Sequence, residues 1–393
     1  MFKYVELENL EKLVAELAAP LGTEFVRVGE AVGRFLAEDV ISPRNLPEFD
    51  VSLVDGYAIS ECDGLLFKLV SNPSLNTCEA SYVETGQPVP EGAVAVVPVE
   101  SARVSGGSVA IPRVYERGHE IARRGSDFSK GEVVGSRGQL VTPPLARALL
   151  GLGVERVRVH RRPRVLIVPT GSEFVSGEGG VESSGLLVKA MCEAVGGVVS
   201  LAEPVEDSAE TISGVLRGGV ERYDVVATIG GVSLGRRDLT VSAAISLPGS
   251  ALLVRGVAVQ PGRATSLARV RGKPVVLLPG LPQSTVSGTV FLLQPLIKRL
   301  QGSSPRAHYP VGLYRLASDY EYKGRFSSFT RVRFVRIADE EKLEVELVEA
   351  PSYSIKTVLS SRGFTILARG VTSLARGSYI TVYRTPGLFP EGV

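Results

Sequence analysis

An apolar run that ends in a glycine turn, DVVATIGGVSLG, occupies residues 224–235 of this 393-residue chain. A second such run, VLIVPTGSE, occupies residues 165–173, and the segment between the two has the spacing of helices and one further strand. Short continuous apolar runs are typical of strands buried on both faces, and their alternation with helices indicates a parallel sheet covered on both sides. We therefore predict a central α/β domain.

The order of the predicted elements supports this domain. In chain order we expect strand 165–168, helix 186–195, strand 198–201, helix 209–216, strand 224–229, strand 275–278 and helix 284–300. Ligands of such sheets bind beyond the carboxyl ends of the strands, where several loops converge. The turns that follow the strands are therefore the first place to expect a site.

Two flanking regions are predicted to be small all-β domains of barrel or sandwich type, because their short β-type runs are separated by Gly, Pro and Asn. In the first, from about Pro43 to Gly138, we expect strands at residues 66–70, 93–99 and 108–111. In the second, after Gly302, we expect strands at residues 311–314, 331–336, 343–347, 365–367 and 379–383.

The N-terminal region reads as helix. A first helix is expected from Leu7 to Leu17, because apolar residues fall on one face and Pro20 with Gly22 stops the run. A second short helix is expected at residues 29–39. We thus predict a multidomain α/β plus all-β protein. Its domains would be a helical linker domain (1–42 and 139–160), an inserted β domain (43–138), the α/β domain (161–302) and a C-terminal β-barrel domain (303–393).

Net charge and hydropathy argue against a nucleic-acid-binding protein and against a membrane-spanning one. The formal net charge is +2, whereas a duplex-binding surface usually shows a strong basic excess, so we expect no nucleic-acid partner. The basic cluster at residues 161–164 could bind a small anion, but such a cluster is more often the solvated start of a strand. We see no signal peptide, and no apolar stretch reaches the roughly 20 residues that cross a bilayer. We therefore expect a soluble, cytoplasmic protein with no membrane partner.

Cysteine and histidine are too sparse to suggest a metal site. Cys62, Cys78 and Cys192 lie far apart without a C-x-x-C pair, so neither a zinc site nor a disulfide framework is predicted, and a reducing compartment is favoured. The histidines are isolated. His160 lies in an alternating run that begins at Val157, so we expect it to face solvent on a strand.

Four predicted strands end in turns that suit a phosphorylated ligand. Three of these turns, at residues 169–173, 230–235 and 279–282, contain glycine or proline, and the fourth carries Glu206 and Asp207. Glycines let backbone N–H groups approach an anion, and a following helix N-terminus adds a favourable dipole. Carboxylates beside such a cradle suggest Mg²⁺, which commonly binds one or two carboxylates plus substrate oxygens. We therefore predict a nucleotide-like ligand with Mg²⁺.

Each of these features also has a purely structural explanation. A Gly-Gly strand exit is usually just a turn, and residues 279–282 also fit a rigid strand-to-helix connection. Asp207, with Glu210 three residues on, reads as a helix N-cap with its capping-box partner. Asp55-Gly56 is the usual dipeptide of a tight hairpin. A ligand site is favoured because such turns recur at four exits of one predicted sheet.

A series of motifs runs through residues 30–282 in unbroken order. They are EAVGRFLAED at 30–39, PEFD at 47–50, DGYA at 55–58, TGQPVPEGA at 85–93, RGSD at 124–127, and the stretches 165–173, 224–238 and 259–282. Together they resemble the molybdopterin molybdenumtransferases, the MoeA type related to the C-terminal part of gephyrin.

The resemblance implies four domains and a homodimer, with a molybdopterin-binding, MogA-like α/β domain at the centre. The site would lie in a cleft between the α/β domain of one subunit and the β domains of the other. Such enzymes insert molybdate into adenylylated molybdopterin in the presence of Mg²⁺ and release AMP. The expected partners are this pterin nucleotide and other proteins of molybdenum cofactor biosynthesis.

The resemblance also implies roles for individual residues. The catalytic residues would be Asp55, Thr85, Glu173 and Asp238, and the metal ligands would be Asp55, Asp127, Asp207 and Asp238. The nucleotide and the pterin would be held by Thr170, Gly171, Gly230, Gly231, Ser233, Gly235, Arg263, Pro279, Gly280 and Pro282. The protein would mainly position the substrate and neutralise charge, because the dithiolene carries the metal chemistry.

Several positions depart from the family pattern, and they cluster in the expected site. They are Val94, Ala122, Ser172, Gly185, Gln260 and Leu281. Gln260 and Ala122 each remove a cation, and losing one hydrogen bond to a charged group costs roughly 1.5–3 kcal/mol. An alternative function is therefore an inactive paralogue that binds or carries the pterin, or serves as a scaffold. Insertion of tungstate instead of molybdate is a third possibility.

Overall fold

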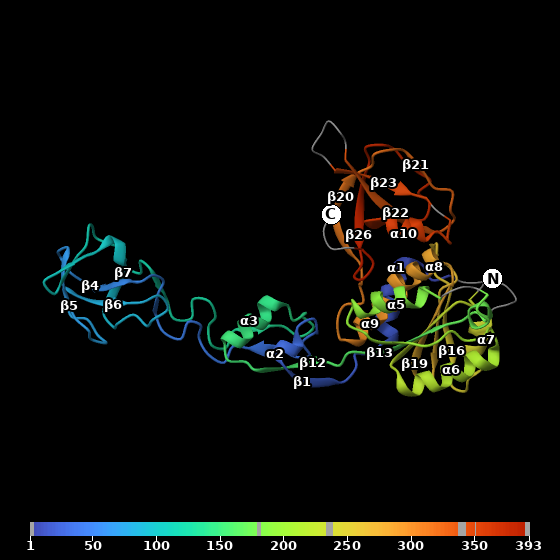
Figure 1. The fold of residues 1–393 in the computed structure, drawn as a ribbon, viewed down its shortest axis with the longest axis horizontal. Helices are drawn as coiled ribbons and strands as arrows, with labels where there is room; N and C mark the ends of the chain where they lie inside the picture. The colour runs from blue at the N-terminus through green and yellow to red at the C-terminus, as the bar shows by residue number, and fades with distance from the viewer. Residues whose placement is uncertain (1–3, 179–181, 233–238, 337–342, 350, 390–393) are drawn as a thin grey trace. The chain divides into compact units, whose positions relative to one another are not determined.

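The computed structural model describes residues 4–178, 182–232, 239–336, 343–349 and 351–389 (Figure 1). The chain forms two compact units. The smaller is Phe25–Val159, and the larger combines Met1–Glu24 with His160–Val393. The four-domain division expected from the sequence stays a proposal.

The larger unit is built on a six-stranded sheet. The strand order is β14 (Val198–Leu201), β13 (Arg164–Pro169), β15 (Val225–Ile229), β19 (Lys273–Leu278), β18 (Ser266–Val270) and β16 (Ala251–Arg255). The first four strands are parallel, as predicted, whereas β18 pairs antiparallel with both of its neighbours, β19 and β16. The α/β prediction is confirmed, but the sheet is mixed, because residues 251–270 return along its edge as an antiparallel pair.

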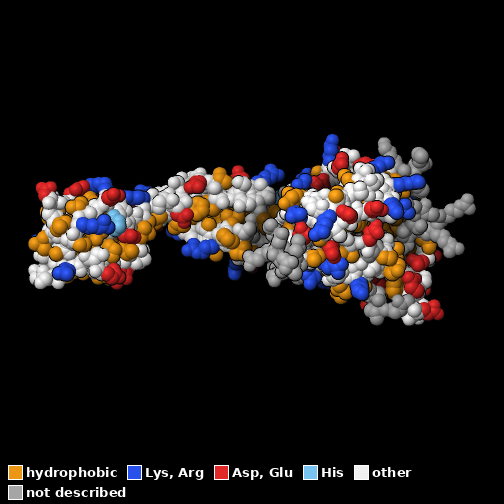
Figure 2. All heavy atoms as spheres, turned by 90° about the horizontal axis from the view of Figure 1, so that it is seen from above, with side chains coloured by type: hydrophobic (Ala, Val, Ile, Leu, Met, Phe, Trp, Pro, Cys, Tyr) orange, Lys and Arg blue, Asp and Glu red, His pale blue; other side chains and the backbone are white. Residues whose placement is uncertain are grey.

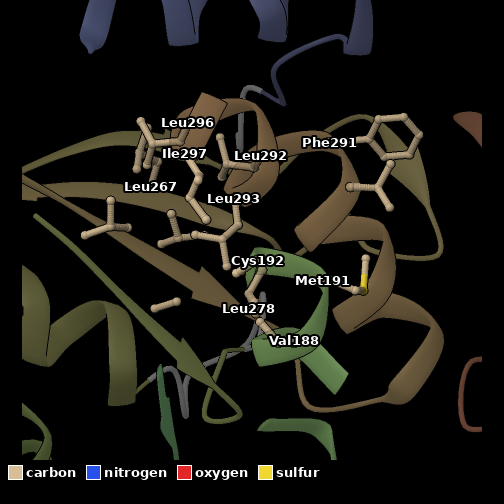
Figure 3. Close-up of a cluster of buried hydrophobic side chains, with 14 of the residues drawn as sticks. Val188, Met191, Cys192, Leu267, Leu278, Phe291, Leu292, Leu293, Leu296 and Ile297 are labelled. Atoms are coloured by element: carbon tan, nitrogen blue, oxygen red, sulfur yellow. The ribbon is translucent and has the colours of Figure 1, made fainter. Parts of the chain in front are cut away.

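Helices cover both faces of this sheet. Those of the larger unit are α1 (Leu7–Leu17), α4 (Ser172–Val175), α5 (Ser184–Glu193), α6 (Ala209–Arg222), α7 (Leu239–Ser246), α8 (Pro282–Gly288), the π-helical segment η2 (Thr289–Leu293) and α9 (Gln294–Leu300). On one face Met191 of α5, Leu296 of α9 and Leu278 of β19 belong to one core cluster (Figure 3). On the other face Ile212 and Leu216 of α6 join the second core cluster. Side chains that alternate along the strands therefore serve two cores.

The C-terminal strands form a second sheet in the larger unit. Its order is β17 (Val259–Gln260), β22 (Ser327–Arg336), β24 (Gly363–Leu367), β26 (Tyr379–Arg384) and β20 (Tyr309–Arg315), and β23 (Leu343–Val348) also pairs with β22. The pair β21 (Tyr320–Glu321) and β25 (Ser373–Leu374) and helix α10 (Ile355–Ser360) complete the region. Strand β17 runs parallel to β22, with Gln260 opposite Ser328. This pairing holds the loop after β17 beside the C-terminal strands.

Helix α1 has the predicted bounds and belongs to the larger unit. Its residues Leu10 and Val14 lie in the core cluster that also contains α9. Phe329 and Phe364 of the C-terminal sheet join the same cluster. Residues distant in sequence thus share one apolar core.

The smaller unit contains another six-stranded sheet. Its order is β7 (Ala93–Pro98), β4 (Gly56–Ser60), β6 (Glu79–Val83), β5 (Leu66–Leu69), β9 (Ser108–Ala110) and β8 (Arg103–Ser105). The short strand pairs are β3 (Val51–Ser52) with β10 (Ile121–Ala122), β2 (Val40–Ile41) with β11 (Val133–Gly135), and β1 (Thr23–Arg27) with β12 (Arg156–His160). The helices are α2 (Val28–Ala31), the 3-10 turn η1 (Val99–Ser101) and α3 (Pro143–Gly151). The predicted strands near 66–70, 93–99 and 108–111 are present.

The helix predicted at residues 29–39 is wrong. Only the single turn α2 forms, because Gly33 takes a left-handed conformation with φ of 80°. Phe35 and Leu36 then make extended bridges to Leu140 and Val159.

Two predictions about sulfur and histidine are also wrong. Cys62 and Cys78 form a disulfide, because they lie just beyond the ends of two paired strands. His160 is buried, and its Nδ1 lies 3.1 Å from the carbonyl oxygen of Leu21. Its ring fills the space that a side chain at Gly302 would need, so this strand residue packs inward.

Charge is mixed over the described surface. On the face that Figure 2 shows, Lys and Arg side chains are interspersed with Asp and Glu. Among the described residues, no helix combines the length and the apolar character that spanning a bilayer requires.

Candidate functional site

The exits of three neighbouring parallel strands meet in the larger unit. The Thr170 N–H donates to the Ile229 carbonyl at 2.8 Å, and the Gly230 N–H donates to the Leu278 carbonyl at 3.0 Å. A Cβ placed on Gly280 would lie 3.5 Å from the Cα of Gly230. The turns after β13, β15 and β19 therefore form one continuous backbone surface, as the sheet prediction requires.

The fourth exit, after β14, joins the same surface. The Gly171 N–H donates to the Val205 carbonyl at 3.0 Å, and the Asp207 N–H donates to Ser172 Oγ at 3.0 Å. Oε1 of Glu173 folds back over the turn, since a Cβ on Gly171 would lie 2.9 Å from it. The exposed carboxylates of Glu173 and Asp207 thus stand beside the glycine turn.

Asp207 does not cap helix α6. The N-cap is Ser208, whose Oγ accepts from the Thr211 N–H at 3.0 Å. The capping explanation for Asp207 is therefore wrong, and its carboxylate is left at the strand exit.

The glycine pair after β15 is required by close packing. Gly230 and Gly231 have φ of 104° and 63°, which L side chains rarely adopt. A Cβ on Gly231 would lie 2.2 Å from Thr240 Oγ1, and that hydroxyl donates to the Gly230 carbonyl at 3.2 Å. The three predicted site residues that follow this turn, Ser233, Gly235 and Asp238, lie outside the described residues.

A cavity of about 370 Å³ opens next to these turns. Three of the predicted ligand-binding residues line it, namely Arg263, Pro279 and Gly280. Pro282 lies just beyond, at the first position of α8. The cavity is also lined by Gln260 and Leu281, two of the positions that depart from the family pattern.

A second cavity, of about 350 Å³, contains a buried arginine that the sequence analysis missed. Arg331 is 1% exposed, and among the described residues its Nη1 and Nη2 have no hydrogen-bond partner. Its Nε donates to Gln283 Oε1 at 3.2 Å, and its guanidinium lies over the Phe329 ring, 4.5 Å from the centroid. Burial lowers the pKa of Arg331 to about 9, so the group is still a cation at neutral pH.

The two cavities are neighbours. Both are lined by Gln260, Pro261 and Ser352, and the pairing of β17 with β22 holds their walls together. Two guanidinium nitrogens without a partner make a strong site for an oxyanion, because a buried cation gains most from a hydrogen-bonded counter-charge. Sequence did contain one signal for Arg331: in a strand it shares a face with the apolar Phe329.

The smaller unit holds the other predicted catalytic residues. Oδ1 of Asp55 accepts from the Thr85 N–H at 2.7 Å and from Thr85 Oγ1 at 2.8 Å. These hydrogen bonds, the backbone one first, hold the pKa of the Asp55 carboxyl below its usual value. Gly56 does not form a hairpin turn. It opens β4, and a Cβ there would lie 2.2 Å from the Val97 carbonyl oxygen.

The described acidic residues do not form a complete metal site. Within the described ranges, no three His, Cys, Asp or Glu side chains gather as ligands. Asp127 is exposed in the smaller unit, and Asp207 and Glu173 lie in the larger one. Exposed carboxylate oxygens beside an anion cradle nevertheless fit Mg²⁺, which takes its remaining ligands from water and substrate.

Comparison with known proteins identifies the family. Residues 5–153 match the family described as the MoeA N-terminal region (domain I and II), and residues 166–299 match one described as a probable molybdopterin binding domain. Molybdopterin molybdenumtransferase 2 of Mycobacterium tuberculosis is 31% identical, over 96% of this chain and 98% of its own length. The chain belongs to the molybdopterin molybdenumtransferase family. It is thus an enzyme of the transferase class in molybdenum cofactor biosynthesis.

Other relatives agree with this assignment. The molybdopterin molybdenumtransferase of Staphylococcus aureus is 28% identical over 71% of each chain. The crystal structure of a molybdopterin biosynthesis MoeA protein from Pyrococcus horikosii is 27% identical and superposes with a TM-score of 0.76, over 97% of this chain and 99% of that one. The MoeA-like fold is therefore established along nearly the whole chain.

The structure accommodates two of the departures from this family's pattern. At Gly185, a Cβ would lie 2.6 Å from Leu201 Cδ1 and 2.8 Å from Glu182 Oε2, and Glu182 accepts hydrogen bonds from the Gly185 N–H in the first turn of α5. Val94 is buried in a core cluster of the small β sheet, where a charged side chain would need a partner. These two replacements are local packing changes.

Proposed function

We propose that this transferase inserts molybdate into adenylylated molybdopterin and releases AMP in a Mg²⁺-dependent reaction. The observation that carries the proposal is Arg331, a buried guanidinium with two nitrogens that no described residue satisfies, in a cavity that shares walls with the cavity beside the glycine turns. A tetrahedral oxyanion accepts two parallel hydrogen bonds from such a group. The site therefore suits one reactant of the proposed reaction.

The remaining roles follow from the chemistry of each group. Backbone N–H groups at the turns after β13 and β15, with Arg263, would bind the phosphates. Pro279, Leu281 and Pro282 would form an apolar wall for the pterin. When bound, Mg²⁺ would neutralise charge on the departing phosphate, and Asp207, Glu173 and Asp238 would hold it.

Asp55 and Thr85 would act on the substrate from the smaller unit. The lowered pKa keeps Asp55 as a carboxylate, able to share a cation with the substrate. Asp127, in the same unit, would provide a further cation ligand.

Molybdate binding to an Arg331→Gln variant tests the proposal. We expect molybdate binding to weaken at least about tenfold, because two charge-assisted hydrogen bonds are lost, and AMP release to fall with it. Arg333→Gln is the matched control, since Arg333 lies on the same strand but is exposed and paired with Glu346. Equal molybdate affinity for the wild type and the Arg331 variant would refute the assignment.

We also propose that the enzyme is a homodimer whose sites combine the smaller unit of one chain with the larger unit of the other. A mixture of Asp55→Ala and Arg331→Gln proteins tests it. Mixed dimers would contain one intact site, so the mixture should regain about a quarter of wild-type activity. No recovery, with exchange of subunits verified, would show that each site lies within one chain.

A second candidate function is pterin binding or carriage without turnover. Gln260 and Leu281 favour it, because both line the cavity and both depart from the family pattern, Gln260 by removing a cation. Retained binding of the pterin nucleotide without AMP release, under any divalent metal, would select this alternative. Tungstate is a further candidate substrate, and competition between the two oxyanions would measure the preference.

A further inference from the structure

Two paired strands of the smaller unit link a disulfide to the Asp55–Thr85 pair. Strands β4 and β6 are antiparallel neighbours, and their Cα partners run from Gly56↔Val83 to Ile59↔Ala80. Asp55 directly precedes β4, and Thr85 lies two residues after β6. Side chains link the two chain segments beyond each end of this paired ladder. The link is covalent at one end and consists of hydrogen bonds at the other.

At one end the closure is covalent. Cys62 and Cys78 form a disulfide across a sequence separation of 16, with their Cα atoms 4.7 Å apart. The Cys78 N–H donates to the Glu61 carbonyl at 3.0 Å. The hydroxyl of Ser60 accepts from the Glu79 N–H at 3.0 Å and donates to the Glu79 carbonyl at 3.1 Å. The ladder is thus continued up to the disulfide.

At the other end the closure is a pair of hydrogen bonds. The carboxylate of Asp55 accepts from the N–H and the hydroxyl of Thr85, and all of these groups are exposed. Hydrogen bonds between exposed groups compete with water and contribute little stability by themselves. Their persistence therefore depends on how well the ladder holds the two chain segments together.

The disulfide is suited to supply that restraint. Without it, the segment between Cys62 and Cys78, which includes β5, would regain the freedom of an open loop. Cys78 also has φ of 58°, a left-handed conformation unfavourable for a residue other than glycine, and it could relax once the cross-link is gone. Both changes would weaken the pairing of β6 with β4, beginning at the N-terminal end of β6, which is the end away from Thr85.

We propose that the Cys62–Cys78 disulfide is a positioning element that keeps the Asp55 carboxylate on Thr85, and that its reduction by a dithiol releases this restraint. A thiolate of the dithiol attacks one sulfur to form a mixed disulfide, and the second thiol resolves it. Two electrons and two protons pass to Cys62 and Cys78, and the dithiol becomes a disulfide. Both cysteines are partly exposed, so a dithiol can reach them. The importance of the pair for catalysis rests on the proposed function.

The test compares oxidised and dithiothreitol-reduced wild-type protein by NMR. On reduction we expect amide exchange at Thr85 to speed up about tenfold, as for the loss of roughly one hydrogen bond. The amide chemical shift of Val97 in the neighbouring β7 should not change, which shows that the sheet is still folded. The Cys62→Ala/Cys78→Ala variant should resemble the reduced protein and should not respond to dithiothreitol.

The outcomes separate this inference from the proposed function. Unchanged Thr85 amide exchange, in protein whose two thiols are verified by mass, would overturn the inference whatever the activity. Faster Thr85 amide exchange on reduction, in a protein that releases no AMP in either redox state, would support the inference and count against the proposed function.

Discussion

Arg331 and Asp224 are both almost fully buried charges, with 1% and 3% exposure, but their surroundings differ. Asp224 accepts two hydrogen bonds from Arg161, each 2.9 Å long, and one from the Arg164 N–H at 2.8 Å. Lys273 Nζ lies 3.7 Å away. The basic cluster at residues 161–164 thus has its anion within the protein. Arg331, by contrast, has two guanidinium nitrogens without a hydrogen-bond partner among the described residues, so it is the better candidate for binding a ligand.

Replacing Asp224 by Asn should destabilise the larger unit. Burial alone would raise the pKa of the Asp224 carboxyl, but hydrogen bonds from Arg161 and the Arg164 N–H outweigh it and lower the pKa. A lowered folded pKa gives stability that is complete above the ordinary value of about 3.9 and is lost as pH falls through the folded value. We expect a loss of roughly 1.5–3 kcal/mol at pH 7 in urea unfolding. A difference from wild type that persists undiminished below about pH 3 would contradict this account.

Replacing Arg331 by Met should have the opposite effect on stability. An unpaired buried cation is costly, so in the absence of oxyanion the variant should be about 1–3 kcal/mol more stable than wild type. Added molybdate should stabilise wild type but not the variant, because only a protein that binds a ligand gains from it. Urea unfolding with and without molybdate measures both effects, and a less stable variant would mean that Arg331 has a structural role.

At the level of elements, the four strand exits illustrate how one sheet collects residues that sequence keeps apart. Backbone hydrogen bonds between Thr170 and Ile229 and between Gly230 and Leu278 follow directly from the parallel register. The start of α6 shows the limit of pattern reasoning, because Asp207 and Ser208 are both good capping residues. Only the backbone geometry shows that Ser208 is the cap.

Substitutions at these two positions should separate stability from function. Ser208→Ala removes the hydrogen bond to the Thr211 N–H and should cost about 1 kcal/mol in unfolding free energy, with AMP release nearly unchanged. Asp207→Ala should leave stability within about 0.5 kcal/mol of wild type but reduce the apparent Mg²⁺ affinity in the AMP-release assay. The reverse pattern would restore Asp207 as a structural residue.

At the level of the whole molecule, the chain is divided into two compact units, and only the smaller one contains a disulfide. A disulfide that closes a loop as long as the one between Cys62 and Cys78 stabilises a fold by about 3 kcal/mol, mainly by restricting the unfolded chain. Redox state should therefore act on one unit and leave the other unaffected.

Scanning calorimetry should reveal this asymmetry. We expect two unfolding transitions, of which dithiothreitol lowers only one, by roughly 10 °C, as an effect of about 3 kcal/mol would produce in a domain of this size. The Cys62→Ala/Cys78→Ala variant should show the lowered transition without reductant. A shift of both transitions together would mean that the units unfold as one.

The amino-acid pattern by itself determined the four parallel strands of the α/β region, its helices α5 and α6, the helical stretch from α8 to α9 and the positions of the turns, but not α4, α7 or the strands β16 and β18. The runs at 165–168 and 224–229 are apolar over their full length, and such local patterns specify strands and their glycine exits without reference to the rest of the chain. The resemblance of the motifs to the family is also a property of the amino-acid sequence alone. Tertiary structure alone decided what depends on distant partners: the burial of Arg331 and His160, the Cys62–Cys78 disulfide, and the antiparallel edge of the sheet. Burial and cross-linking depend on which segments meet in space, and no local pattern contains that information.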